Sequence, residues 1–124
     1  MINLDALCAT YGSNIAGKAN SGNKKDLETL CRNSTGVLQE EGVYAFFIYL
    51  NSKGNPESDN ILQQITKLLQ NKHTRIIPDR GNLFDNTVQS NLLTAMQDLN
   101  TLLYMLKIIM RTMTYALYGI RSIR

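Results

Sequence analysis

Apolar residues recur along most of this chain at spacings of three and four, which is the period of a helix buried on one side. Asn3 is an acceptable N-cap for a first helix from about residue 4 to 19, and the polar run 20–23 ends it. A second helix begins near Lys24, and we expect a break or kink in it at residues 34–36. The apolar stripe of the first helix consists of Leu4, Leu7, Cys8, Tyr11, Ile15 and Ala19.

The most apolar short run, residues 43–50, is rich in the aromatic and β-branched residues that are typical of a buried strand. No second run of similar quality could pair with it, and an isolated strand leaves its backbone groups unpaired. We therefore predict a buried helix that ends in the polar run 51–56. Ser58 or Asp59 then caps a further helix, and residues 73–84 form a loop that has room for a short extended piece at 75–77. The inner face of that further helix carries Ile61, Leu62, Ile65, Leu68 and Leu69.

The last third of the chain predicts one long helix from about residue 85 to 119, because its apolar seam never loses register. A straight helix of that length measures about 50 Å, whereas a compact domain of this size is only about 35 Å across. Either the helix breaks, most plausibly at Asn100, or an apolar end projects and needs a partner. The seam consists of Leu92, Met96, Leu99, Leu103, Leu106, Met110, Met113, Leu117 and Ile120.

Together these patterns predict an all-α fold: a single domain over residues 1–124, built as a compact bundle of about five helices with a long C-terminal helix. Lys107 and Arg111 interrupt the apolar run 102–120, so we expect no membrane-spanning helix. Asp5 precedes any apolar run, which argues against a secretory signal. We expect Cys8 and Cys31 to be reduced core residues of a cytoplasmic protein.

The formal net charge of +3 is concentrated at the C-terminal end of the chain, because acidic and basic residues cancel up to residue 85. A row of basic side chains along one helix edge can follow a phosphate backbone without reading bases, and nearby tyrosines can stack on bases. The other interpretations are a solvated basic tail and tyrosines that only cover the edges of the core. The basic residues of this segment are Lys107, Arg111, Arg121 and Arg124, and its one acidic residue is Asp98. Its tyrosines are Tyr104, Tyr115 and Tyr118. A second and more dilute basic cluster consists of Lys24, Lys25 and Arg32.

Residues for catalysis or metal binding are scarce. His73 is the only histidine and lies in a polar loop, so no Ser/His/Asp or Cys/His set can be assembled without it. The two cysteines lack the spacing of a zinc site. We therefore expect no enzymatic activity, no metal and no cofactor, and a function that depends on the surfaces of the molecule.

Residues 37–54 have the sequence VLQEEGVYAFFIYLNSKG. This stretch, with an apolar pair, a glycine and a helix that ends in Ser-Lys-Gly, resembles a segment of the small subunit of CRISPR RNA-guided effector complexes. The likeness is to type III complexes of the Cmr kind, and a small subunit of a type I complex would look much the same. The order of the predicted helices, with a long last helix, fits the same family.

The resemblance implies a non-catalytic bundle whose copies stack beside the crRNA-bearing backbone subunits and the large subunit. These copies would hold target RNA or single-stranded DNA without reading its sequence. The contact would fall on Lys107, Arg111, Arg121 and Arg124, with Lys24, Lys25 and Arg32. The residues alone leave two other interpretations open. One is a helical adaptor or dimerisation module that acts through the C-terminal seam, and the other is attachment of the last helix to an anionic membrane surface.

Overall fold

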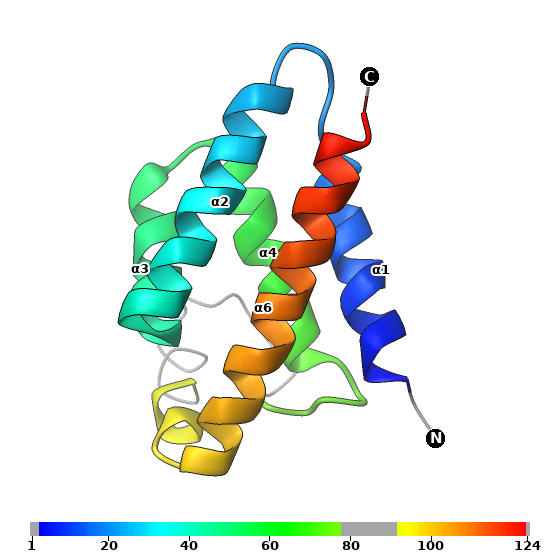
Figure 1. The fold of residues 1–124 in the computed structure, drawn as a ribbon. Helices are drawn as coiled ribbons and strands as arrows, with labels where there is room; N and C mark the ends of the chain where they lie inside the picture. Colours follow the sequence, from blue (N-terminus) through cyan, green and yellow to red (C-terminus); the bar gives the residue numbers. More distant parts are fainter. Residues whose placement is uncertain (1–2, 78–91, 124) are drawn as a thin grey trace.

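The computed structural model describes residues 3–77 and 92–123, which form a bundle of α-helices (Figure 1). This confirms the predicted all-α class and its long C-terminal helix. The helices pack as a ring in the order α6, α1, α4, α3 and α2, and α2 returns to α6. Residues 92–96 add a further helical piece before α6. The bounds are α1 (Leu4–Ala16), α2 (Lys24–Glu41), α3 (Val43–Lys53), α4 (Pro56–Gln70) and α6 (Leu99–Arg121).

The first helix begins as predicted and ends earlier than predicted. The Asn3 side chain accepts a hydrogen bond from the Ala6 N–H at 3.2 Å, which confirms it as the N-cap. α1 stops at Ala16 because the polar segment that follows has its own hydrogen bonds. Asn20 and Asn23 fold this segment by accepting backbone N–H groups at 2.7 to 3.0 Å.

The break that we predicted at residues 34–36 is wrong, because α2 is continuous from Lys24 to Glu41. The hydroxyls of Ser34 and Thr35 both donate to the Cys31 carbonyl, at 3.1 and 2.7 Å, so they are satisfied inside the helix. The chain turns at Gly42 instead, whose φ of 100° lies in a region that side-chain-bearing residues rarely adopt. α3 then starts at the next residue.

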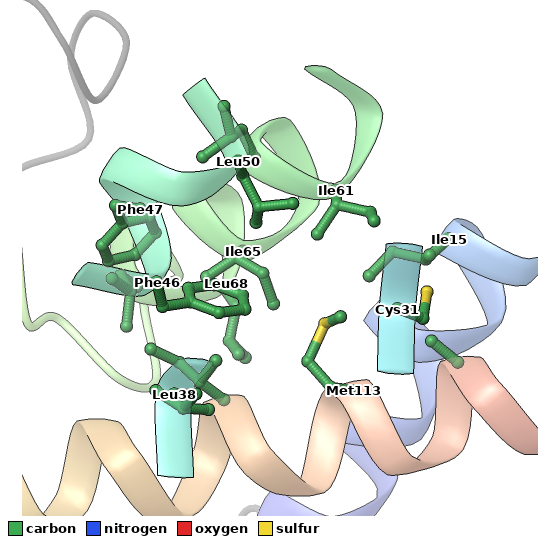
Figure 2. Close-up of a cluster of buried hydrophobic side chains, with 14 of the residues drawn as sticks. Ile15, Cys31, Leu38, Phe46, Phe47, Leu50, Ile61, Ile65, Leu68 and Met113 are labelled. Carbon is green, nitrogen blue, oxygen red and sulfur yellow. The ribbon is translucent and has the colours of Figure 1, made fainter. Parts of the chain in front are cut away.

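The apolar run 43–50 is helical, as predicted, and it supplies the largest side chains of the core. Phe46 and Phe47 are fully buried and meet edge to face with ring centroids 5.4 Å apart. Figure 2 shows them beside the inner face of α4. The five inner-face residues that we predicted for α4 are all buried. The other core residues labelled in the view include Ile15, Cys31, Leu38 and Met113, so α1, α2 and α6 also contribute.

The cap of α4 differs from the prediction of Ser58 or Asp59. Asn55 is the N-cap and accepts from the Ser58 N–H at 2.8 Å, while the Ser58 hydroxyl accepts from the Asn55 N–H at 3.2 Å. This reciprocal pair is a capping box, and Pro56 suits the first helical position because its missing N–H would be unpaired there anyway. α4 ends at Gln70, and residues 75–77 form no strand. The remainder of the predicted loop, residues 78–84, lies outside the described residues.

Of the two alternatives for the helix over residues 85–119, a break or a projecting end, the described part shows the break. The helical piece 92–96 ends, and α6 begins anew at Leu99. Asp98 causes the break, because its carboxylate accepts from the Thr101 N–H at 3.1 Å and from the Thr101 hydroxyl at 2.6 Å. The new helix begins at Leu99, one residue before Asn100, where we expected the break. Residues 85–91 are not among those described.

α6 buries only part of the predicted heptad seam, because Met113 and Ile120 are enclosed whereas the seam residues near its start are not. Its fully enclosed side includes Met105, Ile109, Met113, Ala116 and Ile120. Two members of the predicted seam, Leu99 and Leu103, are instead 66% and 53% exposed. The start of α6 therefore presents apolar side chains outward. No helix in the described part of the chain has both the length and the hydropathy to cross a membrane.

α6 packs closely against α1, and this contact constrains the position of α6 in the bundle. Gly12 of α1 is buried against α6, where a β-carbon at this position would lie 2.7 Å from Tyr115 Cβ and 2.8 Å from the Thr112 carbonyl oxygen. Only glycine lets the two backbones approach this closely. The α1–α6 contact holds the outward side of α6 in place between α1 and α2, as Figure 1 shows.

Candidate nucleic-acid interface

The outward side of α6 carries the basic residues that the sequence singled out. Lys107, Arg111, Thr114, Tyr118 and Arg121 are all exposed and follow one another at steps of four, three, four and three. Such spacing places them in one stripe along the helix. At a rise of about 1.5 Å per residue, Lys107 and Arg111 are about 6 Å apart along the axis, and Arg121 lies about 15 Å further on.

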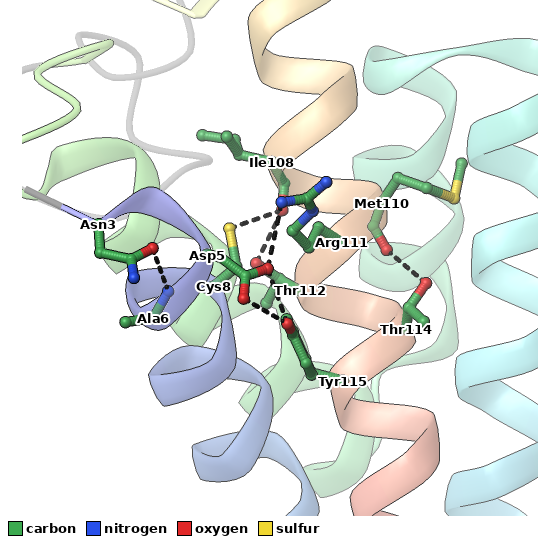
Figure 3. Close-up of polar contacts among 10 residues, drawn as sticks. All are labelled: Asn3, Asp5, Ala6, Cys8, Ile108, Met110, Arg111, Thr112, Thr114 and Tyr115. Atoms are coloured by element: carbon green, nitrogen blue, oxygen red, sulfur yellow. Dashed lines mark hydrogen bonds and ion pairs between the residues drawn. The ribbon is translucent and has the colours of Figure 1, made fainter.

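Arg111 is bound at one edge of the stripe by α1. Its Nη1 lies 3.1 Å from Asp5 Oδ1, and the Tyr115 hydroxyl donates to the same carboxylate at 2.7 Å. Figure 3 shows the three side chains together between α1 and α6. The hydrogen bond to the Asp5 carboxylate raises the pKa of Tyr115. The network places the guanidinium of Arg111 beside the first turn of α1.

The thiol beneath this network is a core group. Cys8 is buried and donates to the Ile108 carbonyl at 3.5 Å. Burial raises its pKa, and burial raises the pKa of Cys31 to about 12. Both cysteines are free, as predicted, and their raised pKa values make them poor nucleophiles.

Arg121 is bound at the opposite edge by α2. Its Nε lies 2.9 Å from Glu28 Oε1. The hydrogen bond from Arg121 lowers the pKa of Glu28, and the nearby charges of Arg32 and Lys24 lower it further. Lys24 also donates to the Ile123 carbonyl just beyond the end of α6. The two basic clusters of the sequence therefore lie side by side in the fold.

The other predicted site residues that the structure describes are exposed to solvent. Lys107 and Lys25 are exposed, and within residues 3–77 and 92–123 neither side chain forms an ion pair or a hydrogen bond. Arg32 is also exposed. Arg124 lies outside the described residues.

The two ion pairs leave both arginines able to bind an anion. Each pair engages one nitrogen of a guanidinium that carries five N–H donors. The Arg111 and Arg121 side chains remain 47% and 46% exposed, and such exposed pairs contribute only about 0–1 kcal/mol. A phosphate can therefore share or displace the carboxylate at small cost. On the face formed by α6 and the start of α2, the basic side chains outnumber the carboxylates.

A shallow hollow of about 440 Å³ lies in the middle of the stripe. Tyr118 borders it and is 63% exposed. Tyr104 and Tyr115 are partly buried and pack against the core, so for these two the core-edge interpretation holds. The residues that line the hollow are Lys107, Met110, Arg111, Thr114, Tyr115 and Tyr118.

The cations of this face can be found from the sequence, whereas their acidic neighbours cannot. Asp5 and Glu28 belong to other helices, and no local pattern signals that they face α6. In the described part of the chain, no three histidine, cysteine or acidic side chains come together as a metal site would require, and His73 is exposed. Comparisons with protein-family models, with curated proteins and with solved structures found no match to this chain.

Proposed function

We propose that this chain is a non-catalytic small subunit of a CRISPR ribonucleoprotein effector complex, of type III or type I. In this proposal the outward side of α6 and the start of α2 hold the target or displaced strand. The family resemblance of residues 37–54 supports the proposal. So does the turn within that stretch, because Gly42 joins α2 directly to the buried helix α3.

One observation carries the nucleic-acid part of the proposal. Basic residues from two distant parts of the sequence meet on one face, where Arg121 and Lys24 flank Glu28, while Lys107 and Arg111 extend the row along α6. Cations placed along a helix attract a phosphate backbone and release its counterions on binding. They make no contact with base edges, so the binding is independent of sequence.

The same face explains how copies would act together. A single bundle offers only a few phosphate contacts, so an isolated copy binds weakly. Copies stacked along the backbone subunits and beside the large subunit would present the strand with a longer row of cations. Their effective affinity then rises because the second contact becomes intramolecular.

Charge reversal on α6 tests this proposal. Lys107→Glu combined with Arg111→Glu should weaken binding of the chain to a single-stranded RNA of mixed sequence. The salt dependence should also become shallower, by about 0.7 in the slope of log K against log salt for each phosphate that the protein no longer neutralises. Binding is measured by fluorescence anisotropy from 50 to 300 mM salt, roughly the range over which such contacts weaken.

A matched variant distinguishes the effect on binding of charge at α6 from the effect of the net charge of the chain. Lys67→Glu with Lys72→Glu makes the same change in net charge on and just after α4, a helix that does not neighbour α6 in the ring. Lys107→Glu alone breaks no ion pair and guards against loss of the Asp5 contact. If the α6 and α4 double variants weaken binding equally, or if neither does, the α6 face is not the interface.

A second candidate function is a helical adaptor that binds a protein helix or a second copy of itself. The exposed Leu99 and Leu103 at the start of α6 favour it, because adjacent exposed leucines mark protein contacts more often than nucleic-acid contacts. This alternative predicts a tight dimer whose stability does not depend on salt and which has no affinity for nucleic acid.

A further inference from the structure

Tyr118 is the tyrosine of the outward stripe, and its ring is largely left outside the packing of the bundle. Its side chain is 63% exposed, whereas Tyr115 is partly buried and donates to Asp5. An aromatic ring held in water on a rigid helix keeps an apolar face open to a ligand. Such rings serve as stacking platforms where cations are close by.

The hollow places Tyr118 and two cations around the same space. Tyr118 lies two turns beyond Arg111, and Thr114 stands between them on the same side of α6. Side chains on a helix lean toward its N-terminus, which from Tyr118 is the direction of Thr114 and Arg111. Arg111 lines the same hollow and pairs with the carboxylate of Asp5.

We propose that this hollow binds one nucleotide of a single strand, with its base stacked on the Tyr118 ring and its phosphate on Arg111 and Lys107. The inference rests on the proposed function and adds the form of the ligand to it. Charge complementarity selects this occupant, because a helix of a partner protein would have to bring carboxylates to the same two cations. A duplex keeps its bases stacked inside, so only a single strand offers a base to the ring.

Abasic strands test the stacking directly, because they retain the phosphates and lack the bases. The wild-type chain should bind an oligothymidylate more tightly than an abasic strand of equal length, by about 5- to 150-fold for one stacked base. Tyr118→Ala should remove this difference and leave affinity for the abasic strand unchanged. Tyr118→Phe should keep it, because the ring remains.

Ile48→Ala on α3 provides a control, since Ile48 is another exposed apolar residue and lies on a different helix. It should leave both affinities unchanged. The stacking inference is overturned if wild type binds both strands equally, or if Tyr118→Ala weakens both by the same factor. In either case binding itself survives, and so does the proposed function. If wild type binds neither strand at low salt, both proposals fail together.

Discussion

At the scale of single residues, Gly12 contributes to how the outward side of α6 is presented. It brings α1 so close to α6 that a β-carbon would meet the Tyr115 Cβ and the Thr112 carbonyl oxygen, both at under 3 Å. Neither atom is the free end of a flexible side chain, so neither can move aside without moving α6. The close packing of α6 on α1 therefore requires that residue 12 carry no methyl group.

Replacing Gly12 by alanine should destabilise the protein despite the better helix propensity of alanine. We expect the free energy of unfolding to fall by about 1–2 kcal/mol, because overpacking costs more than the gain in propensity. Gly36→Ala is the matched control: Gly36 lies inside α2 and a β-carbon there meets nothing within 4 Å. That variant should be stabilised by about 1 kcal/mol. Urea unfolding measures both, and two changes of the same sign would contradict the packing argument.

Cap residues show how far single positions can be predicted from sequence. Asn3 is recognisable because it directly precedes an apolar stripe. Asn55 is harder to distinguish from Ser58, since both residue types cap helices and the sequence does not show which one adopts the extended backbone of a cap. In the structure the two act together, with Ser58 at the third helical position.

At the scale of elements, the helices and the basic edge of α6 could be predicted, whereas the exposure of the leucines at the start of α6 could not. Heptad spacing identifies positions that are apolar, but it does not say which of them the rest of the bundle encloses. Thr112 is fully buried, with its hydroxyl donating to the Ile108 carbonyl at 2.8 Å, while Leu99 stays exposed. The wide apolar surface of α6 is compatible with more than one orientation, and in the observed one it packs closely on Gly12.

The start of α6 should depend on pH through Asp98. Hydrogen bonds from the Thr101 hydroxyl and N–H lower the pKa of Asp98 in the folded state. Its stabilising contribution is therefore complete above pH about 4, the ordinary pKa of an aspartate, and is lost as the pH falls through the lowered folded-state value. Asp98→Ala should lower the melting temperature at pH 7, and this deficit should shrink as the pH approaches 2.

Asp98→Asn distinguishes the effect of the carboxylate charge on stability from the effect of the N-cap hydrogen bond. Asparagine caps helices about as well as aspartate, so this variant should stay close to wild type in melting temperature and should lack the pH-dependent part of the difference. Melting is followed by circular dichroism at 222 nm, a wavelength that reports helix content. A deficit for Asp98→Ala that is the same at every pH would show that the carboxylate charge plays no part.

At the scale of the whole molecule, the candidate interface depends on contacts between helices far apart in sequence. The cations of α6 could be found from sequence because they are concentrated in one segment. Their relation to Lys24 and Arg32 could not, because only the antiparallel packing of α2 on α6 brings Glu28 against Arg121. Asp5 reaches Arg111 across an even longer stretch of chain.

In the proposed function, these long-range pairs would also limit how strongly one copy binds a strand. Two of the three cations along α6 share their charge with a carboxylate, so the positive surface of an isolated bundle is modest. A weakly binding single copy and a strongly binding assembly are the expected consequence. An adaptor would behave in the opposite way, because its contact would depend on Leu99 and Leu103 and be indifferent to salt.

Sedimentation velocity of the purified chain, with and without single-stranded RNA, at 50 and 300 mM salt, tests the central claim most directly. If α6 holds a phosphate backbone, the RNA sediments with bound protein at the lower salt and separates from it at the higher salt. A dimer that persists unchanged at both salt concentrations while the RNA sediments alone would contradict the account.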